Sequence, residues 1–176
     1  MNFSVKQLQT LEVKIASPNQ NSSKSQVIGR LSLVVFDKNT GLVLSFIVSL
    51  GRSFKLVEKG QVQEIDLENG FILLNSRRSL QDIVPHSLAD QALQAENHLL
   101  NLAAVTEGGS SLGIVSDVNI AWPAAILWQV VVTNDEGERL LAKNQIKQIT
   151  DTEVVFIEDV VNPKFKWQAK KALSGI

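Results

Sequence analysis

The stretch LGIVSDVNI at residues 112–120 decides the fold, because the chain carries a second version of it, IGRLSLVVF, at residues 28–36. Sliding the sequence along itself by 84 positions places Gly29 over Gly113, and the two stretches then agree in their apolar register. A repeat at a fixed offset indicates one structural unit used more than once. We therefore predict that a β-rich unit occurs twice in tandem.

The match extends without a gap from residues 28–75 to residues 112–159. An alternation of strongly apolar residues recurs in both copies: Leu44, Phe46 and Val48, then Trp128, Val130 and Val132. Side chains of a strand point alternately to two faces, so a slip of one residue would expose the whole set. The shared alternation therefore predicts strands that bury the same face in each copy.

A step of three between apolar positions also recurs, from Leu31 to Val34 and from Val115 to Val118. Within a strand the expected step is two, and an inserted residue is the usual cause of a longer one. We predict a β-bulge at the same place in each copy.

Short apolar segments separated by turn residues fill both copies. The predicted strands are residues 11–15, 28–36, 42–48, 54–57, 61–65 and 70–74, and then 99–106, 112–120, 126–133, 138–142, 145–149 and 154–157. Turns are predicted at 37–41, 68–70 and 134–137, where Asn or Gly can adopt a positive φ. Five or six short strands at close spacing favour a small closed barrel over a parallel sheet.

The predicted architecture is all-β, with two tandem small barrels joined by a short α-helix and a possible C-terminal helix. The four parts are a first barrel at 1–84, a linker helix at 85–98, a second barrel at 99–161 and a basic tail at 162–176. In the linker, Ser87 and Asp90 resemble a capping box. A helix there would place four apolar residues on one face: Leu88, Ala92, Ala95 and Leu99.

Composition excludes several classes of protein. The chain has 176 residues, 44% of them hydrophobic, a formal charge of −1 and no Cys. It is too apolar to be wholly disordered and too near neutral to be a generally basic nucleic-acid binder. Without Cys it has no disulfide framework.

The sequence also favours a soluble, cytoplasmic protein. The first 17 residues lack a basic stretch followed by an apolar run, so no signal peptide is predicted. The most apolar window, residues 120–132, contains Pro123 and Gln129. A membrane-spanning helix needs about 18 or more apolar residues, so a buried strand pair is expected instead.

The repeated stretches resemble the PRC-barrel family, named for the photosynthetic reaction-centre H subunit and including the C-terminal domain of a ribosome maturation factor. The resemblance is carried by residues 112–120, 126–132, 146–149 and 154–157 of the second copy, and by 28–34, 62–65 and 71–74 of the first. The first copy departs from the family pattern at Leu33, where the family often has Asp or another polar residue. The resemblance implies six-stranded barrels that serve as assembly or adaptor modules, without shared catalytic residues.

No residue pattern indicates an enzyme. His86 and His98 lie 12 positions apart, which is not the spacing of a helical metal pair, and each is expected to be a surface or cap residue. The carboxylates are scattered through turns. The glycine-rich stretch at 108–113 lacks a following Lys-Ser/Thr and opens a strand, so it is not a phosphate loop. We expect no catalytic residue, no cofactor and no metal.

Two segments are candidates for contact with a partner. Trp122, in a hairpin turn, could anchor an interface or cap the end of its own barrel. The tail carries four Lys and no acid, and its candidate contact residues are Lys164, Phe165, Lys166, Trp167, Lys170 and Lys171. Asn162 and Pro163 would begin a helix with Phe165, Ala169, Ala172 and Leu173 on one face. That helix would either dock on the barrels or bind an anionic surface.

The expected function is that of a non-enzymatic adaptor which binds a protein partner through its barrel surfaces. RNA or ribosome association and peripheral binding to an anionic membrane are the alternatives, and both rely on the basic tail. A unit of 60–70 residues buries too little surface to be very stable alone. The two units are therefore expected to pack on each other or on a partner, including a second copy of the chain.

Overall fold

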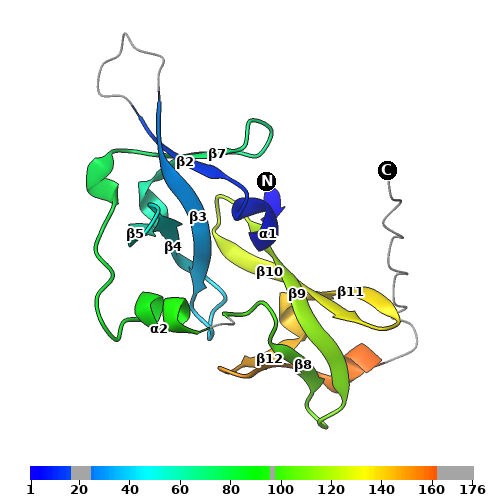
Figure 1. Cartoon of the computed structure of the whole chain (residues 1–176). Coiled ribbons are helices and arrows are strands. Elements are labelled where there is room, and N and C mark those ends of the chain that lie inside the picture. Colours follow the sequence, from blue (N-terminus) through cyan, green and yellow to red (C-terminus); the bar gives the residue numbers. More distant parts are fainter. Residues whose placement is uncertain (17–24, 96–97, 162–176) are drawn as a thin grey trace.

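A computed structural model describes residues 1–16, 25–95 and 98–161 (Figure 1). These residues form two antiparallel-rich sheets, one for each half of the chain, which confirms the predicted all-β class. None of the helices in these ranges is long and apolar enough to cross a membrane.

The first sheet has six strands in the order β5-β4-β3-β2-β7-β6. Their bounds are β2 Glu12–Ile15, β3 Gln26–Phe36, β4 Val43–Ser49, β5 Phe54–Glu58, β6 Val62–Asp66 and β7 Phe71–Leu74. Neighbouring strands are antiparallel, except that β2 and β7 pair in parallel.

The second sheet repeats this order as β11-β10-β9-β8-β13-β12, with one additional strand, β1, paired with β9. Its strands are β1 Asn2–Ser4, β8 Ala103–Thr106, β9 Ser111–Ala121, β10 Ile126–Asn134, β11 Gly137–Ala142, β12 Ile146–Ile149 and β13 Glu153–Phe156. The parallel pair recurs as β8 with β13. The same topology in both halves supports the predicted duplication.

The two halves also share their irregularities. The register shifts between Leu31 and Leu33 where β3 pairs with β4, and it shifts between Val115 and Asp117 where β9 pairs with β10. Ser32 and Ser116 therefore occupy the predicted bulges. Gly29 and Gly113 are equivalent as well, because a Cβ at either position would overlap the carbonyl oxygen of Ser49 or Thr133.

The prediction of a match without a gap was wrong at its end. The offset of 84 holds from β3 to β6, but β7 begins at Phe71 and β13 at Glu153, an offset of 82. The turn between the last two strands is two residues shorter in the second half. The shorter turn, rather than the strands, absorbs the length difference, because the strands are fixed by pairing on both sides.

Each sheet must curl strongly. In the first, β5 and β6 lie at opposite ends of the strand order but are joined by the three-residue 3₁₀ turn η1 (Lys59–Gln61). A flat six-stranded sheet is about 24 Å wide at about 4.8 Å per strand. A three-residue 3₁₀ turn advances only about 6 Å. The second sheet has the equivalent turn, η3 (Lys143–Gln145), between β11 and β12.

The two halves meet around a local pseudo-twofold axis. Leu42 forms an isolated antiparallel bridge with Ile126, its own counterpart 84 positions later. The amide of Val43 donates to the carbonyl of Ala125 at 2.8 Å, and the amide of Leu127 donates to the carbonyl of Gly41 at 2.8 Å. Self-complementary pairs of this kind are typical of a twofold interface. One buried apolar cluster continues through both halves.

Two helices lie outside the repeated strands. Helix α1 (Val5–Leu8), which was not predicted, follows β1 and buries Val5 and Leu8 in the shared core. Helix α2 (Leu88–Gln94) lies within the predicted linker, and Ser87 Oγ accepts from the amide of Asp90 at 3.2 Å. The reciprocal half of the predicted capping box is absent, because the Asp90 carboxylate accepts from His86 N–H.

The predicted apolar face of α2 was partly wrong. Ala92 is buried, but Leu88 is 57% exposed and Ala95 is also exposed. Ala89 and Ala92 instead pack against Val35 and Ile47 of the first sheet. Small side chains allow the helix to approach the sheet closely, which turns the larger Leu88 to the outside.

Candidate functional site

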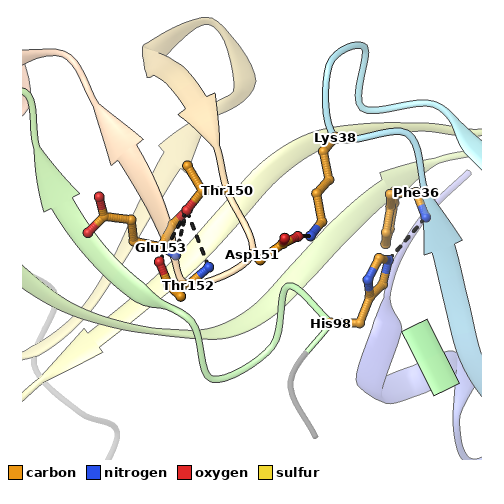
Figure 2. Close-up of polar contacts among 7 residues, drawn as sticks. All are labelled: Phe36, Lys38, His98, Thr150, Asp151, Thr152 and Glu153. Carbon is orange, nitrogen blue, oxygen red and sulfur yellow. Dashed lines mark hydrogen bonds and ion pairs between the residues drawn. The ribbon is translucent and has the colours of Figure 1, made fainter. Parts of the chain in front are cut away.

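A cleft of about 830 Å³ lies where the two halves meet, and we call it the junction cleft. Its walls come from four segments: the turn after β3, helix α2, His98, and the turn between β12 and β13. Figure 2 shows side chains from three of these segments converging, with Lys38 and Asp151 directed toward each other and His98 beside Phe36.

The turn after β3 is held by its own hydrogen bonds. Asp37 Oδ1 accepts from the amides of Asn39 at 2.8 Å and Thr40 at 3.1 Å. The Gly41 amide donates to the Asp37 carbonyl at 2.7 Å, and Gly41 has a φ of 74°, which glycine adopts without steric cost. These bonds fix the backbone that carries Lys38.

The opposite turn is fixed by Thr150. Its Oγ1 accepts from the amides of Thr152 at 3.2 Å and Glu153 at 3.1 Å (Figure 2). The Thr150 amide also donates to the Glu153 carbonyl at 2.9 Å. The turn therefore presents Asp151 from a defined backbone.

Lys38 and Asp151 form an ion pair between the two halves, with Nζ and Oδ1 2.5 Å apart. The hydrogen bond from Lys38 and its positive charge hold the pKa of Asp151 below its ordinary value. The Lys38 side chain is 28% exposed, whereas that of Asp151 is 94% exposed. An ion pair so open to water contributes little to stability, so a ligand can replace either partner at small cost.

His98 forms the inner wall of the cleft. Its Nε2 accepts from the Phe36 N–H at 3.3 Å, and its ring stacks on that of Phe36 with centroids 6.4 Å apart. The neutral imidazole therefore carries its proton on Nδ1. Burial lowers the pKa of His98 to about 4; the charge of Lys38 lowers it further and that of Asp151 opposes the shift.

A second cavity, of about 410 Å³, lies on the other side of His98. His98 and Phe36 line both cavities, and the second is completed by α1 and by Val34 and Val118, which are equivalent in the two halves. The two spaces therefore share the Phe36 and His98 side chains at the end of β3.

The pseudo-twofold counterpart of this site is filled. Trp122 stands at the position equivalent to Lys38, and its ring lies 6.2 Å from Phe3 and 6.2 Å from Phe46 between centroids. Strand β1 pairs there with β9, with Phe3 opposite Ile120, the counterpart of Phe36. On the cleft side, the Phe36 amide is met by the His98 ring in place of a strand.

Of the predicted contact residues, Trp122 alone lies within the described part of the chain. Trp122 packs against the core on the filled side. This position agrees with the second alternative for Trp122, a residue that covers one end of its own half. The tail residues Lys164, Phe165, Lys166, Trp167, Lys170 and Lys171 lie outside the described residues. His86 lies beside the N-terminus of α2, where its amide donates to Asp90. In the glycine-rich stretch, the Gly108 amide donates to the Glu158 carboxylate before β9 begins.

The cleft presents few charges and several amides. It offers one lysine, Lys38, the carboxylates of Asp37 and Asp151, the side-chain amides of Asn39, Gln91, Gln94 and Gln148, and apolar surface from Leu88 and Ile149. Within residues 1–16, 25–95 and 98–161, no group of three or more His, Asp or Glu side chains is gathered as metal ligands.

Sequence reasoning did not find Lys38, His98 and Asp151 as a group. His98 was expected at the surface or in a cap but is half-buried in a turn after α2. The one usable signal was the exchange of Trp122 for Lys38 at equivalent positions of the repeat. Such an exchange indicates that the two copies differ there, but it does not identify the residues that face it across the fold.

No protein-family model matches the sequence, and no curated protein matches it.

Proposed function

We propose that the protein is a non-enzymatic adaptor that binds a protein partner in the junction cleft. The observation that carries the proposal is the asymmetry of the two equivalent sites. One is filled by β1 and Trp122, while the other leaves a cleft of about 830 Å³ lined by side chains of both halves.

The lining of the cleft suits a polypeptide. Leu88 is 57% exposed at its rim, and Gln91 and Ile149 extend the surface on the two sides of the Lys38–Asp151 pair. A mixture of apolar contact, amide groups and a few charges is typical of protein interfaces. Because the ion pair is open to water, a partner carboxylate could take over Lys38 without leaving a buried charge.

We also propose that the two halves are tandem barrels of the PRC type. The shared strand order, the parallel β2–β7 and β8–β13 pairs and the curl required by η1 and η3 support this assignment. Such barrels serve as assembly modules, which agrees with an adaptor in the cytoplasm. RNA binding and membrane association are the alternatives, and they rely on lysines of residues 162–176.

The test is quantitative affinity capture with the full chain. Leu88→Arg places a bulky cation at the rim of the cleft, and Val84→Arg is the matched control, because Val84 is 65% exposed and does not line the cleft. We expect a protein that is enriched by the wild type and by Val84→Arg to fall at least about tenfold with Leu88→Arg, because the variant places an unpaired charge in an apolar contact.

A Lys38→Glu variant should lose the same protein. If no captured protein distinguishes the two arginine variants, the junction cleft is not the partner site. If capture is unchanged in all variants but is abolished by nuclease, the RNA alternative replaces the adaptor function.

A further inference from the structure

The outer face of the first sheet is covered by helix α2. Leu33, Ile47 and Leu56 lie opposite one another on β3, β4 and β5. They form a small buried cluster with Val35, Ala89, Ala92 and Leu93. The helix thus covers a sheet face that would otherwise present four apolar side chains to water.

Among the described residues, the equivalent face of the second sheet is met by a helix only at Asp117, whose Oδ1 accepts from the Lys6 amide of α1 at 3.2 Å. Val131 of β10 lies opposite Leu140 of β11, as Ile47 lies opposite Leu56 in the first sheet. Leu140 is 45% exposed, and Ile114, on the same side of β9, is 48% exposed. We call these residues, Ile114, Val131 and Leu140, the uncovered face.

The segment that follows β13 carries the same short pattern as α2. Residues 89–93 read ADQAL and residues 169–173 read AKKAL. The pattern begins 15 residues after the end of β7 and 13 residues after the end of β13. In α2, the two alanines and the leucine of this pattern are the residues that contact the sheet.

The two sheet faces carry different charges, and so do the two segments that follow the sheets. Where the first sheet has Leu33 and Phe54, the second has Asp117 and Glu138. Between the alanines, Asp90 and Gln91 of α2 are replaced by Lys170 and Lys171. Opposite charges attract across a partly exposed contact. The second segment is therefore complementary to the second face and not to the first.

We propose that residues 162–176 dock in cis as a helix on the uncovered face, with Ala169, Ala172 and Leu173 against Ile114, Val131 and Leu140. This helix would be the counterpart of α2. The uncovered face lines no part of the junction cleft, so the inference is independent of the proposed function.

Paramagnetic broadening in the full chain tests the proposal. The chain has no Cys, so Ser174→Cys provides a single site for a nitroxide label. On a helix, position 174 lies away from the face shared by 169, 172 and 173. We expect the amide signals of Ile114, Val131 and Leu140 to lose more than half of their intensity. Those of Leu33, Ile47 and Leu56 should keep theirs.

A matched pair of variants on this background separates docking from chance proximity. Ala172→Glu places a carboxylate on the docking face and should restore the three signals, whereas Gln168→Glu adds the same charge beside that face and should not. Broadening that is absent, or equal over both sheets, would overturn the proposal. A mixed sample provides a second check, in which a ¹⁵N-labelled chain without the nitroxide is observed beside a ¹⁴N chain that carries it. Broadening of the ¹⁵N chain would also overturn the proposal, because the contact would then lie between two copies.

Discussion

His98 shows how one side chain can replace a strand. On the filled side, β1 satisfies the edge of β9 at Ile120, while on the open side an imidazole nitrogen accepts the equivalent amide of Phe36. A ring that accepts at Nε2 must be neutral there, because a protonated ring would present a second donor to the Phe36 N–H. Burial and the nearby Lys38 keep it neutral by lowering its pKa to about 4.

Stability should therefore depend on His98 in a defined pH window. Its pKa is about 4 when folded and about 6.5 when unfolded, so the unfolded chain binds the additional proton between these values. The free energy of unfolding should fall on acidification from about pH 6.5 to 4, by on the order of 3 kcal/mol, and His98 should add no pH dependence above this window. Urea titrations of the wild type at a series of pH values measure this slope.

His98→Gln is the control for that titration, because glutamine can accept from Phe36 without titrating. Its slope in the same window should be smaller than that of the wild type. Asp151 and Asp82 have lowered pKa values through hydrogen bonds from Lys38 and Lys55, so their contribution is lost below about pH 4. A hydrogen bond from Lys147 lowers the pKa of Glu107 in the same way, and its contribution begins to be lost at the acidic end of the window in both proteins, so the difference between the two slopes reports on His98. Equal slopes in wild type and His98→Gln would contradict the assigned role.

The Lys38–Asp151 pair should contribute little to folding, although it joins the two halves. A double-mutant cycle with Lys38→Met and Asp151→Asn is expected to give only a small coupling energy, because Asp151 is exposed. The coupling should decrease further in high salt. A coupling several times larger would mean that the pair is structural and that the cleft is not free to exchange it for a ligand.

At the scale of the strands, the bulged β3–β4 and β9–β10 pairs depend on glycine. A Cβ at Gly29 would overlap the Ser49 carbonyl, and a Cβ at Gly113 would overlap the Thr133 carbonyl. We expect Gly29→Ala and Gly113→Ala each to lower the free energy of unfolding by about 2 kcal/mol or more, because the paired strands must separate. Chemical denaturation followed by circular dichroism measures the loss.

Gly60→Ala is the matched control, since nothing lies within 4 Å of a Cβ at that position. Its effect should stay within about 0.5 kcal/mol of zero. If the three variants are equally stable, the close approach of the strands does not explain these glycines.

The strands of the repeat could be predicted from the sequence, whereas the short strand β1 and the turn before β8 could not. Period-two alternation marks β10, where Val130 and Val132 are buried, but the predicted face was wrong at Trp128, which is 39% exposed at a register shift. In β4, residues 45–48 are all buried, because α2 also covers the outer face of that strand. Strand β1 has only three residues, and it exists because β9 pairs with it 115 to 119 positions away. The start of β8 was predicted at residue 99 but lies at Ala103, because residues 99–102 turn through positive φ at Leu99 and Asn101.

The junction cleft was beyond sequence reasoning for the same reason. Lys38, His98 and Asp151 belong to three segments that no local pattern connects. Their meeting is a consequence of how two repeated units pack around a twofold axis. A duplicated chain can specialise one of two equivalent positions, and here Trp122 fills one while Lys38 leaves the other open.

At the scale of the molecule, the two halves should unfold as one unit. The buried cluster is continuous through both, β1 belongs to the second sheet although it begins the chain, and the Leu42–Ile126 bridge ties the two hairpins together. Each half alone would expose this shared core, and a second half without β1 would leave part of the β9 edge open to aggregation. Cooperative unfolding is expected when the units share most of their buried surface.

Phe46→Ala is the decisive variant for this expectation. Phe46 belongs to the first sheet, is 1% exposed and contacts Trp122 of the second half. Removing a buried Phe typically costs about 3–5 kcal/mol. If the halves are coupled, the urea midpoint should fall equally for Trp fluorescence, which reports on Trp122, Trp128 and Trp167, and for amide exchange at Val35 and Ile47. Phe54→Ala is the control, because this side chain is 40% exposed. With either probe, it should lower the free energy of unfolding by less than about 1 kcal/mol. A midpoint that falls only for the first-sheet amides would show that the halves are separate folding units.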